Sequence, residues 1–84
     1  MYGVFNGVRL SRIVSIVSVP AMDGSELCTF HAIERSTELE SELRLGEAGL
    51  LILATRAFEG KIVAYAGDSQ NGFDVTLELK GARS

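Results

Sequence analysis

The chain of 84 residues has no tryptophan, only two tyrosines and only eight Lys and Arg residues, which leaves a formal net charge of −3. Binding to single-stranded nucleic acid uses aromatic rings as stacking platforms, and non-specific binding uses positive charge. Both are scarce here, so nucleic acid is an unlikely partner. A weakly nucleic-acid-binding small barrel that uses Arg9, Arg12 and Arg35 is the least favoured of three hypotheses.

Cysteine and histidine each occur once, as Cys28 and His31. A single thiol cannot form an internal disulfide. One Cys and one His cannot supply the four ligands of a structural zinc site, and we predict neither a metal nor a cofactor. The polar loop Gly67–Gly72 lacks the acid spacing of a calcium-binding loop and reads as a turn. The chain also lacks phosphate-binding glycine motifs and a G-x-S-x-G nucleophile elbow.

Long apolar runs are missing as well. Val8–Val19 is apolar, but Arg9 and Arg12 interrupt it, and it is too short to span a bilayer. No terminal stretch has the pattern of a signal peptide. We therefore expect a cytoplasmic protein without a membrane partner.

Apolar residues are nevertheless abundant, at 46% of the chain, with a mean hydropathy of +0.21. A chain of this length forms one domain, residues 1–84, with a thin core. Apolar side chains that remain outside the core usually mark an interface. The composition therefore predicts a homo-oligomer. The alternative is a monomeric closed barrel that buries both faces of its strands.

Glycine-containing turns divide the second half of the chain into an antiparallel meander. Glu59-Gly60 and Asn71-Gly72 are the expected turns. The expected strands are Leu50–Phe58, Lys61–Ala66 and Phe73–Lys80. The last has the clearest alternation, with apolar residues at every second position from Phe73.

Three further strands are expected in the first half, with turns at Asn6-Gly7 and Asp23-Gly24 and a stop at Pro20. Their ranges are Tyr2–Phe5, Val8–Val19 and Glu26–Glu34. Along the third strand, Cys28 falls on the more apolar face, with Phe30 and Ala32, and His31 on the mixed face.

The segment between the third and fourth strands fits two structures. Thr37 and Glu40 have the spacing of a capping box, and Leu39 and Leu43 share a helical face. The same leucines also alternate at period two, as in a strand. We favour a helix over Thr37–Leu45, followed by a turn that Gly46 and Gly49 bracket. The predicted fold is mainly β, at the margin of α+β: a small antiparallel sheet or barrel-like meander of about six strands with one short helix.

Few residues are candidates for catalysis or ligand binding. His31 is the one low-ranking catalytic candidate, because Cys28 lies on the opposite face of its strand and makes a poor partner. Arg56, on a strand face with apolar neighbours such as Phe58, can bind a carboxylate or phosphate, cover apolar surface, or pair with Glu59. The candidate ligand-binding residues are Arg56, His31 and Tyr65.

Three functional classes follow from these patterns. The first is a non-catalytic, self-associating β-rich module that binds a protein or a small ligand. The second is an enzyme whose pocket forms between subunits and uses His31 and Arg56. The third is the nucleic-acid-binding barrel described above.

Overall fold

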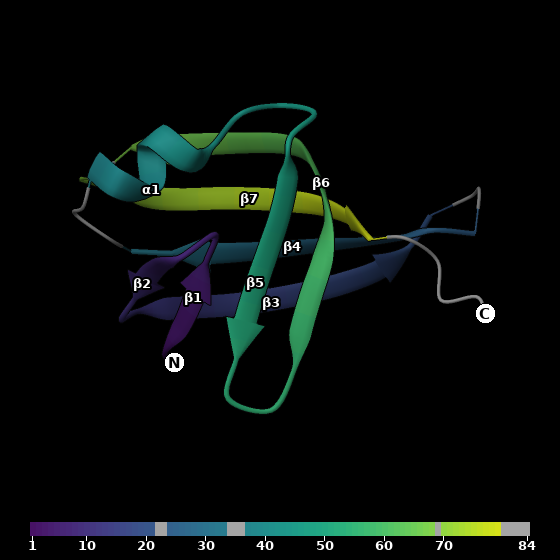
Figure 1. The fold of residues 1–84 in the computed structure, drawn as a ribbon, viewed down its shortest axis with the longest axis horizontal. Coiled ribbons are helices and arrows are strands. Elements are labelled where there is room, and N and C mark those ends of the chain that lie inside the picture. Colours follow the sequence, from purple (N-terminus) through teal and green to yellow (C-terminus); the bar gives the residue numbers. More distant parts are fainter. Residues whose placement is uncertain (22–23, 34–36, 69, 80–84) are drawn as a thin grey trace.

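The computed structural model describes residues 1–21, 24–33, 37–68 and 70–79. They form one antiparallel sheet of seven strands and one short helix, so the prediction of a mainly β fold with a single helix is confirmed (Figure 1). The elements are β1 (Gly3–Phe5), β2 (Val8–Leu10), β3 (Ile13–Pro20), β4 (Glu26–Ala32), α1 (Thr37–Glu42), β5 (Ala48–Leu53), β6 (Ala57–Asp68) and β7 (Gly72–Leu79).

The sheet has the strand order β2-β1-β5-β6-β7-β4-β3, and it is open, with β2 and β3 as its two edges. It folds over itself into two layers. In Figure 1, β5 and the first half of β6 cross the direction of β3, β4 and β7. The strand β6 belongs to both layers, because its beginning pairs with β5 and its end pairs with β7. An irregularity between Ile62 and Ala64 marks the bend, as bulges commonly do.

The core lies between the two layers. Phe5 from β1 meets Phe30 from β4 there, with ring centroids 5.4 Å apart. The core side chains are those of Phe5, Leu10, Ile13, Cys28, Phe30, Ala32, Leu39, Leu43, Leu51, Phe58, Ile62, Phe73, Val75, Leu77 and Leu79. The predicted inner faces of β4 and β7 supply seven of these residues, which confirms both alternation patterns.

The helix α1 is confirmed where the capping pattern places it, although it spans only Thr37–Glu42. Leu39 and Leu43 are both buried, at 0% and 4% exposure. The helix and the residue after it thus contribute these two side chains to the core. Leu45 is 64% exposed, because the chain has already left the helix.

The expectation of one long strand over Val8–Val19 is wrong. The chain breaks at Ser11 and Arg12, between β2 and β3. These two strands lie at opposite edges of the sheet, so the chain must change layers here. Leu10 and Ile13, on either side of the break, are both buried.

The expected turn at Glu59-Gly60 is also wrong. The chain turns earlier, where Leu53 N donates to Arg56 O at 2.7 Å, and Glu59 and Gly60 lie inside β6. Leu50–Phe58 is therefore not one strand. Gly60 allows β6 and β7 to lie close together, since a Cβ at this position would lie 2.3 Å from the carbonyl oxygen of Glu78.

Gly49 is likewise a strand residue of β5 rather than part of a turn, because its missing side chain leaves room for Leu77. The Asn6-Gly7 turn is confirmed, with φ of 50° and 85°. Gly24 and Gly72 also have positive φ. Parts of other expected elements lie outside the described residues, namely Asp23, Glu34, Arg35 and Lys80.

Candidate functional site

His31 lies on the outer face of the β3–β4–β7 layer, directly across from Asp74 of β7. Its Nδ1 is 2.8 Å from Asp74 Oδ1. One step along the same two strands, the hydroxyls of Thr29 and Thr76 are 3.0 Å apart. These two contacts form a polar row that links β4 to β7 on the exposed side of the sheet.

Ser15 of β3 is opposite His31 on the other side, so that Ser15, His31 and Asp74 follow one another across three strands. A hydrolytic triad needs the second imidazole nitrogen to reach the hydroxyl. Here His31 Nε2 lies beside Gly72 of β7, where a Cβ would come within 2.9 Å of it. The ring therefore faces β7, and no hydrogen bond between Ser15 and His31 is found among the described residues. The row joins β4 to β7 through two side-chain contacts.

Cys28 is fully buried on the inner face of β4, as predicted. Burial raises the pKa of its thiol, and the negative charge of Glu26 raises it further, while the positive charge of Arg56 opposes both. A thiol in such surroundings stays protonated and unreactive. Cys28 and His31 thus lie on opposite faces of β4, as the alternation indicates.

Arg56 lines a cleft of about 490 Å³ between β3 and the turn that joins β5 to β6. Such a volume falls within the range of about 300–1,000 Å³ that is usual for small-molecule sites. The residues that line the cleft are Met1, Tyr2, Ile16, Leu53, Ala54, Thr55, Arg56 and Phe58. None of the described lining residues carries a carboxylate.

The guanidinium of Arg56 stacks over the ring of Phe58, with Cζ 4.7 Å from the ring centroid. No ion pair with Glu59 or another acid is found within the described part of the chain. Arg56 belongs to the turn and does not share a strand face with Ile52, which lines a different hollow. Its neighbour in the cleft is instead Ile16 of β3, which sequence spacing cannot reveal.

The structure separates His31 from Arg56 within one chain. Ile16, in the cleft, pairs with Phe30 and faces the core side of β3. His31 faces the outer side, so the β3–β4 layer lies between it and the cleft. Tyr65, the third candidate, is 45% exposed on β6 and is not among the lining residues of the cleft. The three candidates therefore do not form one site.

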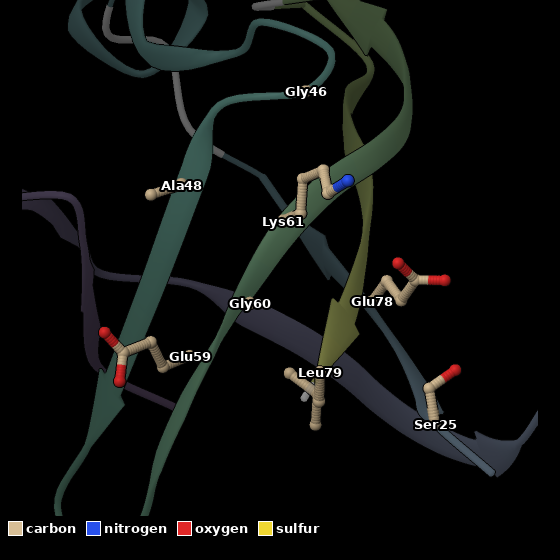
Figure 2. Close-up of a pocket in the computed structure, with 8 residues that line it drawn as sticks. All are labelled: Ser25, Gly46, Ala48, Glu59, Gly60, Lys61, Glu78 and Leu79. Carbon is tan, nitrogen blue, oxygen red and sulfur yellow. The ribbon is translucent and has the colours of Figure 1, made fainter. Parts of the chain in front are cut away.

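A second cleft, of about 590 Å³, lies where β6 passes from β5 to β7. Its floor includes Gly60, and its charged residues are Glu59, Lys61 and Glu78. Figure 2 shows the Glu59 carboxylate pointing away from Lys61 and Glu78. Lys61 lies directly opposite Glu78 in the register of β6 and β7, and only the Glu59 carboxylate points elsewhere (Figure 2). This arrangement does not define a ligand.

The remaining observations concern ions and membranes. Among the described residues, no group of three or more His, Cys, Asp or Glu is arranged to hold a metal ion. The six-residue α1 is too short to cross a bilayer, and the described residues form no longer apolar helix. Arg9 and Arg12 are exposed at the β2 edge of the sheet and beside it, and Arg35 lies outside the described residues.

The position of β3 at an open edge of the sheet does not follow from the sequence pattern, because the order of the strands is set by long-range pairing. Residues Val14, Val17 and Val19 are 58%, 56% and 47% exposed. Ile13 N donates to Met1 O at 2.9 Å, which covers only the beginning of the edge. The strand contains no charged residue from Ile13 to Pro20.

Comparison of the chain with protein-family models, curated proteins and solved structures finds no match.

Proposed function

We propose that this protein is a non-catalytic interaction module that self-associates through the β3 edge of its sheet. The observation that carries the proposal is the uncharged, valine-rich free edge from Val14 to Pro20. An exposed apolar edge strand presents unpaired backbone N–H and C=O groups, and it pairs readily with another strand.

The other edge of the sheet provides an internal comparison. The strand β2 has only three residues, and its centre is Arg9. Short length and charge are the devices by which proteins protect sheet edges. On β3, Pro20 and the irregularity between Ile13 and Ser15 limit pairing at the two ends of the strand. Between them, Ser15 to Val19 is a longer uncharged stretch of edge than β2 offers, which favours a specific role for β3.

The lack of charge on β3 favours a second copy of the chain as the partner of this edge. The net charge of −3 opposes the approach of two copies in general, but β3 brings no charge to the contact. Antiparallel pairing about a two-fold axis is self-complementary. Centred on the free stretch, it would place Val17 opposite Val17 of the second copy and continue the sheet across the dimer.

Substitution of Val17 by Lys tests this pairing. Val17→Lys would place two like charges directly opposite each other at the axis, which destabilises a strand pair. Light scattering coupled to size exclusion should give a mass that rises with concentration from 9.0 kDa toward twice that value for the unsubstituted protein. Val17→Lys should remain at 9.0 kDa throughout.

Leu45→Lys is the matched control, because Leu45 is an equally exposed apolar residue outside β3. It should behave like the unsubstituted protein. A chain that stays monomeric at the highest concentration, or a Val17→Lys variant that still associates, would rule the proposal out. We also propose a cytoplasmic setting, because a fold with one buried thiol needs no oxidising compartment.

A further inference from the structure

We propose that the cleft beside Arg56 binds small amphiphiles that carry a carboxylate on an aliphatic chain, with octanoate as a representative probe. This ligand site goes beyond self-association and does not depend on it.

The charge of the ligand follows from Arg56. The guanidinium carbon of Arg56 lies over the ring of Phe58, 4.7 Å from its centroid. A guanidinium has a planar fork of N–H groups that can donate to both oxygens of a carboxylate.

Arg56 and the apolar lining of the cleft divide the ligand between them. Ile16 and Leu53 line the cleft and pack against the core. A carboxylate bound at Arg56 would therefore place its aliphatic tail against these two side chains.

The apolar residues that line the cleft favour a ligand with an aliphatic chain. Ile16 and Leu53 are partly buried and pack against the core, so the cleft is continuous with the core. Met1 and Tyr2 are 65% and 78% exposed at its rim and would be covered by a ligand. The face of Phe58 is already occupied by Arg56, which favours an aliphatic chain over an aromatic ring.

The test is a titration with octanoate, followed by the methyl resonances of Ile16 and Leu53 in two-dimensional NMR spectra. Octanoate should shift these methyl resonances saturably, and octylammonium should bind at least about tenfold more weakly, because its charge has the same sign as Arg56. Arg56→Gln should weaken octanoate binding by about tenfold or more, the usual effect of losing a hydrogen bond to a charged group.

Arg44→Gln is the matched control, since Arg44 is exposed and lies outside the cleft. It should bind octanoate as the unsubstituted chain does, and so should the Val17→Lys variant. The site is disproved if octanoate moves no methyl resonance in the cleft, if octylammonium binds as well, or if Arg56→Gln binds as tightly. These results are read separately from the oligomeric state, so failure of one proposal leaves the other standing.

Discussion

At the scale of single residues, glycine serves two different purposes in this chain. Gly7 adopts a positive φ in the β1–β2 turn and has open space around it. Gly60 lies in mid-strand and lets β6 approach the backbone of Glu78. Since both kinds of glycine follow a polar residue, sequence inspection assigned the same turn to each, and only the first assignment is right.

Alanine substitutions distinguish these two purposes. Gly60→Ala should lower the free energy of unfolding by about 3 kcal/mol, because its Cβ would collide with backbone that cannot move aside cheaply. Gly7→Ala should cost about 1 kcal/mol, the usual strain of a left-handed residue. Urea unfolding measures both. Equal losses would mean that β6 and β7 are not in close contact at Gly60.

Asp68 gives the β6–β7 turn a dependence on pH. Its carboxylate accepts hydrogen bonds from the backbone N–H of Asn71 at 2.8 Å and of Gln70 at 2.9 Å. These bonds, with a side-chain contribution from Asn71, lower the pKa of Asp68 from its ordinary value of 3.8. A lowered pKa in the folded state stabilises the fold above the ordinary value, and this stabilisation is lost as the pH falls through the folded value.

The variant Asp68→Asn keeps an oxygen acceptor and removes the titration. Its stability should therefore fall less steeply than that of the unsubstituted protein as the pH drops below about 4. Urea unfolding at several pH values between about 6 and 2.5 measures the two slopes. Identical slopes would show that the turn does not depend on the charge of Asp68.

At the scale of secondary-structure elements, the sequence was most informative where one face of an element is buried. The strands β4 and β7 and the helix α1 each present alternating or helical apolar positions to a single core, and all three were predicted. The predictions failed where the chain changes layers. The break after β2 and the turn before β6 have no Pro, Gly or Asn, and long-range packing fixes their positions.

Leu39 tests the contribution of α1 to the core. Its side chain is fully buried, so Leu39→Ala should destabilise the fold by about 2–5 kcal/mol through lost contacts and a cavity. Leu45→Ala, at a position that is 64% exposed, should change stability by no more than about 0.5 kcal/mol. Thermal or urea unfolding measures both. A small loss for Leu39→Ala would show that the helix is dispensable.

Some contacts of the candidate site residues are local in the sequence, and others depend on how the sheet folds. The stacking of Arg56 on Phe58, two residues away, is a local feature, and Arg56 was identified from its apolar neighbours. The approach of Ile16 to Arg56 depends on how the sheet folds over, and so does the pairing of His31 with Asp74. No spacing within one segment encodes either contact.

At the scale of the whole molecule, the apolar excess in the composition is spread over several places, which include β5 and β6. Part of it lies along the free edge of β3, and part of it surrounds Arg56 in the cleft. Two copies joined through β3 would cover the first location, and an aliphatic ligand would cover the second. The edge strand β3 and the cleft thus account for part of the apolar surface that this small chain keeps outside its core.

The decisive measurement is backbone amide hydrogen exchange of β3 at high and low protein concentration. Amides that join a strand pair between two copies exchange only when the pair opens. The outward amides between Val14 and Val19 should therefore be protected at high concentration and lose that protection on dilution, while those of β2 stay unchanged. Exchange along β3 that is independent of concentration, or protection that appears only on another strand such as β6, would contradict self-association through this edge.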